Sequence, residues 1–170
     1  MHFIKRYGLL LFTLAAIQFT QAQTKLIVDA AGTGDYKTIQ GAINSLPDSS
    51  ATARIIYIKK GIYKEKLYIE KNNIVFEGAE RAATIITAAI ARDEWRCEHN
   101  DDWGVATMNV GANDITLKNL TITNSYGFDF LEDRLIDCPS DTTAKQKKIT
   151  KTGHQMALRT MNCTRLKAIN

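Results

Sequence analysis

Cysteines are few in this chain of 170 residues, and their number is odd. The three are Cys97, Cys138 and Cys163, and no two of them form a Cys-x-x-Cys pair. An odd count prevents all of them from pairing within one chain. One disulfide and one free thiol are possible, but buried free cysteines are common and pack as small apolar side chains. We therefore favour an interpretation without a structural disulfide framework, while the pairing of the three cysteines stays open.

Long apolar runs are absent after the first 22 residues, so no later segment could span a membrane as a helix. At the N-terminus, Lys5 and Arg6 precede an apolar run over residues 9–19, which small residues follow. This order is typical of a signal peptide. A membrane anchor is the alternative, but the run is well short of the roughly 20 residues that a spanning helix needs. We expect residues 1–22 to be a signal peptide and residues 23–170 to form one secreted or periplasmic domain, with no membrane partner after cleavage.

The excess of positive charge is too small to indicate a nucleic-acid partner. The chain carries 22 Lys and Arg against 18 Asp and Glu, a net charge of +4, of which Lys5 and Arg6 contribute two. No basic stripe with interleaved aromatic residues is present. A Gly-x-Ser-x-Gly motif is also missing, which argues against Ser-His-Asp catalysis.

Residues 92–103 are rich in acidic side chains but lack the spacing of a metal site. Zinc sites need ordered His and Cys spacings, and calcium sites need a defined loop of oxygen ligands. We expect a solvated turn here, with no metal and no cofactor. Trp95 and Trp103 in this segment are candidates for stacking on a sugar, although one or both could instead cover the body of the domain.

The apolar pattern predicts one short helix followed by many short strands. Four apolar residues at the i, i+3, i+4, i+7 spacing predict a helix over residues 38–46, which Pro47 ends. The β-rich segments are residues 55–58, 67–69, 73–76, 84–87, 106–110, 115–117, 120–123 and 156–159.

A faint internal repeat favours a solenoid over its main rival, a β-sandwich. Residues 74–78 resemble residues 115–119, which lie 41 positions later, and residues 116–120 resemble residues 165–169, which lie 49 positions later. We interpret each offset as two coils of about 20 to 25 residues. The predicted helix would then cap the first coil and cover an exposed sheet edge.

Two blocks near the N-terminus resemble those of the pectinesterase family. Residues 32–40 read Gly-Thr-Gly-Asp-Tyr-Lys-Thr-Ile-Gln, and residues 61–65 read Gly-Ile-Tyr-Lys-Glu, which matches the family's Gly-x-Tyr-x-Glu block. The resemblance covers residues 27–170. It implies an all-β fold, a right-handed parallel β-helix with a short N-terminal capping helix. It also implies hydrolysis of the methyl esters of polygalacturonate (pectin) to pectate and methanol, without a cofactor.

A third block, residues 153–159, reads Gly-His-Gln-Met-Ala-Leu-Arg and resembles the family's Gln-Ala-x-Ala-Leu segment. The resemblance assigns to Gln155 the role of stabilising the oxyanion formed during ester cleavage. Met156 departs from the family's usual alanine. His154 would point to the opposite face of a strand, so we do not expect it to be catalytic. Thr107 resembles a threonine near the family's substrate groove.

Residues 125–151 have few strand signals and are expected to form a long excursion from the coil. Loops of this length are usually functional or disordered. A solvated loop is one interpretation. The other is that the excursion walls one side of a polysaccharide cleft, where Lys145, Lys147 and Lys148 bind galacturonate carboxylates.

The family's two catalytic aspartates have no counterpart in a matching block of this chain. Carboxylates are available at Asp114, Asp129, Asp133 and Asp137, but none lies in such a block. The family's later Gln-Asp-Thr, Asp-Phe and Gly-Arg blocks are also missing. We therefore expect the chain to be truncated and inactive alone. A non-catalytic carbohydrate-binding β-helix is the alternative function, and a pectate lyase is a lesser one.

Overall fold

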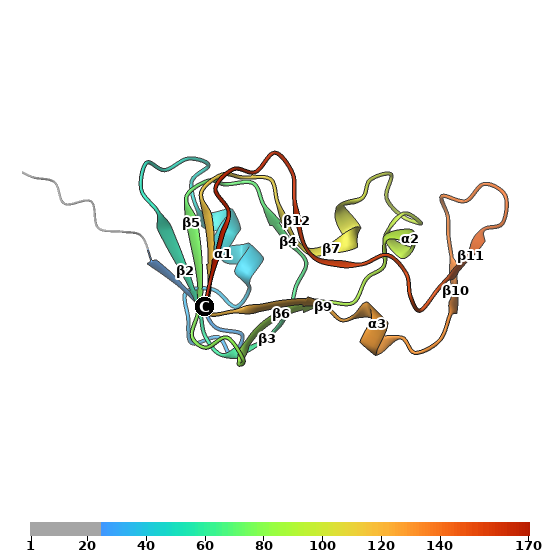
Figure 1. Ribbon diagram of the computed structural model, residues 1–170, viewed down its shortest axis with the longest axis horizontal. Helices are drawn as coiled ribbons and strands as arrows, with labels where there is room; N and C mark the ends of the chain where they lie inside the picture. The colour runs from blue at the N-terminus through green and yellow to red at the C-terminus, as the bar shows by residue number, and fades with distance from the viewer. Residues whose placement is uncertain (1–24) are drawn as a thin grey trace, which may run out of the picture.

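Figure 1 shows the computed structural model, which describes residues 25–170 as a coil of short strands with side excursions. Strands of successive turns stack into three sheets, and every strand pair within these sheets is parallel. The predicted parallel β-helix is therefore confirmed. The expected signal peptide, residues 1–22, lies outside the described residues.

From residue 54 onward, each turn visits three sheets in the same order, which we call A, B and C. Sheet A contains β1 (Lys25–Val28), β2 (Arg54–Ile58), β5 (Ile74–Gly78), β8 (Ile115–Lys118) and β13 (Lys167–Ile169). Sheet B contains β3 (Gly61–Lys64), β6 (Thr84–Ala88) and β9 (Thr121–Asn124). Sheet C contains β4 (Leu67–Ile69), β7 (Ala106–Val110) and β12 (Met156–Thr160).

The core of the coil is a stack of apolar side chains that point inward from equivalent positions of successive turns. In sheet A, Ile56 lies opposite Phe76, and Phe76 lies opposite Leu117. These side chains are 0%, 0% and 5% exposed, whereas their neighbours along each strand are half-buried. The two-residue period of a strand therefore sorts each segment into an inner and an outer face.

The internal repeat is real, but the predicted number of coils per repeat was wrong. Because Ile74 pairs directly with Ile115, the 41-residue offset is a single turn. Lys167 pairs with Thr116, so the next offset is 51 residues, two more than predicted. The turn from Arg54 to Ile74 takes only 20 residues. Later turns are longer because excursions are inserted between sheets B and C.

The predicted helix forms as α1 (Ile39–Ser45) and covers the first turn of the coil. Its buried face consists of Ile39, Ala42 and Ile43, and Thr38 caps its N-terminus by accepting a hydrogen bond from the Gly41 N–H at 3.1 Å. The apolar face was predicted from the sequence pattern, whereas the side-chain cap was not. None of the helices in residues 25–170 has the length and apolar character needed to cross a membrane.

Two excursions leave the coil and extend to one side of it (Figure 1). The first, residues 89–105, contains α2 (Arg92–Trp95) and the 3-10 helix η1 (Trp103–Val105). The second, residues 125–155, contains α3 (Tyr126–Asp129) and an antiparallel hairpin of β10 (Arg134–Asp137) and β11 (Gln146–Ile149). Residues 125–151 were predicted to have few strand signals, and the hairpin corrects this. Its strands were missed because they are only four residues long and mix charged with apolar side chains, most of them exposed or half-buried.

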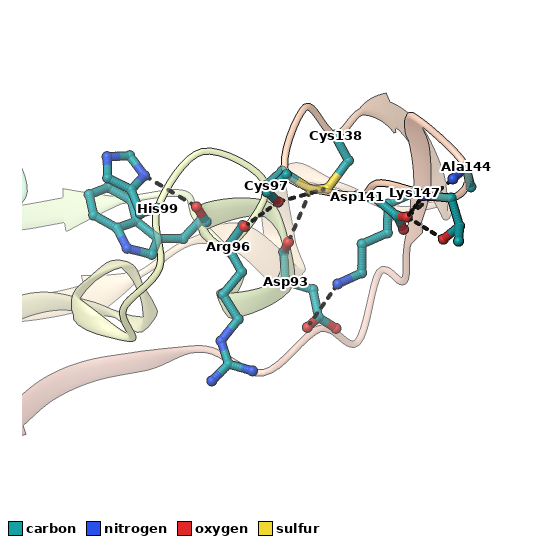
Figure 2. Close-up of a disulfide and its surroundings, with 11 residues drawn as sticks. Asp93, Arg96, Cys97, His99, Cys138, Asp141, Ala144 and Lys147 are labelled. Atoms are coloured by element: carbon teal, nitrogen blue, oxygen red, sulfur yellow. Dashed lines mark hydrogen bonds and ion pairs between the residues drawn. A yellow bond between two sulfur atoms is a disulfide. The ribbon is translucent and has the colours of Figure 1, made fainter.

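A disulfide joins the two excursions, contrary to the interpretation that we favoured from the sequence. Cys97 is bonded to Cys138 (Figure 2). Cys163 is a free cysteine. Around the bond, the Ser140 N–H donates to the Cys97 carbonyl at 3.2 Å, and the Ser140 hydroxyl donates to the Arg96 carbonyl at 2.8 Å. The pairing was not deducible because it depends on where two separate excursions meet.

Candidate functional site

Three successive links from sheet B to sheet C meet at one corner of the coil. The first turn makes this link with residues 65–66, whereas the second and third turns make it with the excursions at residues 89–105 and 125–155. A cavity of about 340 Å³ lies at this corner, and we call it the corner cleft. Its lining residues are Lys64, Glu65, Lys66, Thr87, Ala88, Ala89, Ser125 and Asp129.

Gln155 directly precedes β12 and is not itself among the residues that line the corner cleft. Its side-chain Oε1 accepts a hydrogen bond from the Gly127 N–H at 3.2 Å, and Gly127 lies between the lining residues Ser125 and Asp129. No residue among 25–170 accepts a hydrogen bond from Gln155 Nε2, so both of its N–H groups are available as donors. A Cβ atom at Gly127 would lie 2.8 Å from Nε2. Glycine at this position therefore permits the close approach of the amide.

The residues before and after Gln155 are exposed and contact other parts of the molecule through their backbones. The His154 side chain is exposed, and its carbonyl accepts a hydrogen bond from the Arg92 N–H at 2.8 Å. This contact joins the second excursion to the first. Met156, which begins β12, is 38% exposed and pairs with Ala106.

Thr107, which resembles a threonine near the family's substrate groove, is buried. The residue is 0% exposed, and its hydroxyl donates to the Thr123 carbonyl at 2.8 Å. This bond connects sheet C to sheet B, and a contact of Thr107 with substrate stays a prediction. All of β7 is covered in this way, since its five residues are buried.

The three predicted substrate-binding lysines are not gathered at the corner cleft. Lys147 lies 3.6 Å from Asp93, and Lys148 lies 2.9 Å from Asp133. Lys145 is exposed and lines a separate cavity of about 570 Å³ near the tip of the β10–β11 hairpin. The hairpin carries all three away from the coil, and their binding of galacturonate carboxylates stays a prediction.

Among the four carboxylates considered from the sequence, only Asp129 lines the corner cleft. Its Oδ2 accepts a hydrogen bond from the Ser125 hydroxyl at 2.6 Å. The others have charged or polar partners elsewhere. Hydrogen bonds from Lys148 hold the pKa of Asp133 below its usual value, and hydrogen bonds from Arg165 do the same for the pKa of Asp114. Asp137 accepts a hydrogen bond from Gln146 Nε2 at 3.1 Å.

Beside the corner cleft, three half-buried aromatic residues form what we call the aromatic patch: Tyr68, Trp95 and Trp103. The rings of Tyr68 and Trp103 have centroids 5.6 Å apart. Asp101 holds both indole residues, because its Oδ1 accepts from Trp95 Nε1 and from the Trp103 N–H, each at 2.8 Å. These two bonds lower the pKa of Asp101.

Lys66 and Arg159 surround the aromatic patch with positive charge, and neither was identified from the sequence. Lys66 Nζ lies 5.1 Å from the centroid of the Trp95 ring and 5.3 Å from that of the Tyr68 ring. The Arg159 guanidinium lies 5.9 Å from the centroid of the Trp103 ring. Lys66 follows the Gly-x-Tyr-x-Glu block directly, but no property of the sequence indicated that it would meet residues 95–106.

Two arginines and one aspartate form salt bridges within the first excursion. Asp102 forms salt bridges with Arg92 and Arg96, both with N···O distances of 2.8 Å. The hydrogen bond from Arg92 is the main reason why the pKa of Asp102 falls to about 2. Asp102 is therefore ionised throughout the physiological pH range. Its two salt bridges hold the backbone that directly precedes Trp103.

Comparison with known proteins gives a consistent family. The family model described as Pectinesterase matches residues 25–163. Pectinesterase A of Dickeya chrysanthemi is 35% identical over 124 residues, which cover 69% of this chain and 33% of that protein. A pectinesterase of Daucus carota is 37% identical over 106 residues, which cover 60% of this chain and 33% of that protein. This chain thus spans about a third of the length of these relatives.

Solved structures lead to the same family. A pectin methylesterase in complex with a hexasaccharide has a TM-score of 0.64 and 26% identity, over 86% of this chain and 42% of that one. Pectin methylesterase from carrot has a TM-score of 0.61 and 26% identity, over 88% of this chain and 40% of that one. The coil, the blocks at residues 32–40 and 61–65, and the family match over most of the described chain agree, and the chain belongs to the pectinesterase family.

Proposed function

We propose that the protein is a secreted pectinesterase that hydrolyses the methyl esters of polygalacturonate to pectate and methanol. The observation that carries this proposal is the family match together with Gln155, whose amide N–H groups have no acceptor among residues 25–170. A hydrolase of this class forms a tetrahedral intermediate with a negatively charged oxygen. A preorganised donor stabilises that charge in the transition state.

The arrangement of Gln155 suits this role. The Gly127 N–H donates to its Oε1 at 3.2 Å, which orients the amide so that Nε2 remains the donor. The donor is thus fixed before the substrate arrives, and little reorganisation is needed when the oxyanion develops.

The nucleophile and the acid/base group are expected to be aspartates, as in an aspartyl esterase. Residues 1–170 contain no block that matches those of the family's catalytic aspartates. Two described carboxylates line the corner cleft, Glu65 and Asp129. Glu65 accepts hydrogen bonds from the N-terminus of α1, and Asp129 accepts one from a serine hydroxyl, so the two do not form a catalytic pair with each other. We therefore propose that residues 23–170 supply the oxyanion donor and part of the binding surface, but not the complete catalytic pair.

Sugar binding is supported by the aromatic patch and its cations. Aromatic rings stack on the apolar faces of sugar rings, and a polygalacturonate chain carries a carboxylate on each unmethylated unit, which Lys66 and Arg159 would attract. One of the solved relatives was crystallised in complex with a hexasaccharide. If residues 23–170 bind pectin without hydrolysing it, this surface is the first place to test.

Methanol release from methylated pectin tests the proposal. We expect none above background from residues 23–170 alone, and measurable release from a longer polypeptide that carries the aspartate blocks. In that polypeptide, Gln155→Ala should lower turnover by about 10²-fold because one oxyanion donor is lost. Gln146→Ala is the matched control, since Gln146 lies on the exposed hairpin and bonds to Asp137.

Two results would contradict this assignment. Unchanged turnover of the Gln155→Ala variant would remove Gln155 from the site. Hydrolysis by residues 23–170 alone would show that the reacting carboxylate lies within them, and Asp129 would then be the first candidate.

A further inference from the structure

We propose that Lys66 is a positioning residue whose ammonium group holds the aromatic patch together over sheet C. The part of this proposal that concerns sugar binding rests on the proposed function. The contact between Lys66 and the two tryptophans does not depend on it. No family block includes Lys66, because the Gly-x-Tyr-x-Glu block ends at Glu65.

The ammonium group joins two segments that are far apart in the sequence. Lys66 lies in the short link from β3 to β4, and its Nζ donates to the carbonyls of Trp103 and Ala106, the latter at 2.6 Å. Both carbonyls belong to the end of the first excursion, where η1 leads into β7. A neutral amine would donate more weakly to the same carbonyls, since charge-assisted hydrogen bonds are the stronger ones.

The same group contacts two rings of the aromatic patch. Its distances of 5.1 Å from the Trp95 centroid and 5.3 Å from the Tyr68 centroid lie within the range of cation–π attraction. Trp95 packs directly against the backbone of Gly104, where a Cβ atom would lie 1.8 Å from its ring and would exclude it. Trp95 also stacks on His99, with centroids 3.5 Å apart and the rings 5° from parallel. Lys66 and His99 thus both restrain the indole.

The charged groups near Lys66 have opposing effects on it. Asp101 favours the ammonium form, whereas Arg159 opposes it. Tyr68, which burial makes harder to ionise, remains neutral there. On the side of the corner cleft the charged groups are Lys64, Glu65 and Asp129, and the Glu65 carboxylate already accepts hydrogen bonds from the N-terminus of α1.

Burial lowers the pKa of Lys66 to about 8. A lysine in water keeps its proton until about pH 10.4. The bonds that hold Trp95, Trp103 and Tyr68 should therefore weaken at mildly alkaline pH, and sugar binding by the aromatic patch should weaken with them.

Intrinsic fluorescence tests the contact directly, because Trp95 and Trp103 are the only two tryptophans in the chain. The emission of the wild-type protein should change between neutral pH and about pH 9.5 with a midpoint near pH 8. In Lys66→Met and Lys66→Gln this transition should be absent, and the emission at neutral pH should resemble that of the wild type at alkaline pH. Lys66→Arg should keep the neutral-pH emission throughout, since arginine stays charged. Far-UV circular dichroism checks that each variant is folded.

Two control variants separate Lys66 from other groups. Lys60→Met removes an exposed lysine that pairs with Glu80 and should keep the transition. His99→Gln should also keep it, because the transition belongs to Lys66 and not to the imidazole. An unchanged wild-type emission over this range, or a transition that persists in both Lys66→Met and Lys66→Gln, would overturn the proposal.

A binding measurement then tests the connection to function. The affinity of the wild-type chain for a methylated galacturonate oligosaccharide should fall by several-fold from neutral pH to about pH 9.5, whereas that of Lys66→Arg should not. Equal loss of affinity in both proteins would overturn the role of Lys66 in binding. If neither protein binds the oligosaccharide at any pH but the fluorescence transition is present, the proposed sugar site fails while the positioning of the tryptophans by Lys66 stands.

Discussion

At the scale of single residues, the two N-terminal family blocks owe their pattern to contacts with each other. Glu65 accepts hydrogen bonds from the N–H groups of Ile39 at 2.9 Å and Gln40 at 3.0 Å, at the N-terminus of α1. Gln40 in turn accepts from the Tyr68 N–H at 2.9 Å and donates to the Tyr68 carbonyl at 3.2 Å. The glutamate of one block thus caps the helix, and the glutamine of the other covers the first strand of sheet C. Both residues are structural in this chain.

Replacing Glu65 should therefore destabilise the cap of the coil. In Glu65→Gln one carboxylate oxygen becomes an amide NH₂ that faces a backbone N–H group, and the remaining bond loses its charge. We expect the free energy of unfolding to fall by about 1–2 kcal/mol. Urea denaturation measures this, with Glu70→Gln as a control because Glu70 is exposed at the end of β4. Equal stability of the two variants would show that Glu65 does not cap α1.

At the scale of elements, the corner between sheets C and A repeats the same backbone conformation in successive turns. Asn73, Asp114 and Arg165 occupy equivalent positions there, with φ of 57°, 59° and 58°. Asparagine and aspartate tolerate this left-handed region better than other non-glycine residues. Arg165 is an unusual choice, and its guanidinium forms a bidentate pair with Asp114 of the preceding turn.

Side-chain hydrogen bonds connect these corners into a ladder. The Asn72 Oδ1 accepts from the Asn113 N–H at 2.7 Å. The Asn113 Oδ1 accepts from the Thr164 N–H at 2.8 Å and from the Thr164 hydroxyl at 2.7 Å. Each turn thus supplies an acceptor for a backbone group of the next, which strand pairing leaves unsatisfied at a corner.

Asn113→Ala should break this ladder in its middle. The substitution removes the acceptor of two hydrogen bonds, so we expect the free energy of unfolding to fall by about 1–2 kcal/mol. Asn100→Ala is a control with an exposed asparagine outside the ladder. Thermal and urea denaturation of both variants measure this change. A loss of unfolding free energy no larger than that of Asn100→Ala would mean that the ladder adds no stability.

At the scale of the whole molecule, the coil and the paired excursions are stabilised differently. The coil has one continuous apolar core, whereas the smaller core of the excursions contains Ala91, Tyr126 and Ile149. Polar contacts between the excursions supplement it, including a 2.6 Å salt bridge from Arg134 to Glu94. The Cys97–Cys138 disulfide closes a sequence separation of 41 residues across them. Figure 2 shows this bond beside the Asp93–Lys147 ion pair.

Removing the disulfide should loosen the excursions more than the coil. In a Cys97→Ser, Cys138→Ser double variant, we expect the free energy of opening of the β10–β11 hairpin to fall by about 2–4 kcal/mol, because a long loop is no longer closed. Native-state hydrogen exchange of the hairpin amides measures this. Cys163→Ser is the matched control, since it removes a thiol that forms no disulfide. Protection of the hairpin equal to that of the control would mean that the other contacts suffice.

Much of the coil follows from short-range patterns that the sequence by itself determines. The helix at residues 38–46 and the strands at residues 67–69 and 106–110 were predicted with boundaries that match closely. The reason is that inward side chains recur every two residues in a strand and every three to four residues in a helix. Burial in a single core keeps these positions apolar. The family blocks then indicated how such strands are arranged.

Only the tertiary structure decided which distant residues meet at the corner between sheets B and C. The one-turn register of the repeat, the Cys97–Cys138 bond and the burial of Thr107 all depend on how long excursions fold back onto the coil. The contact of Lys66 with Trp95 and Trp103 has the same origin. Such contacts leave no periodic pattern in the sequence. The chain between the two partners can vary in length without changing the strands that it connects. Their energies depend on burial and on neighbouring charges, and both are set by the fold.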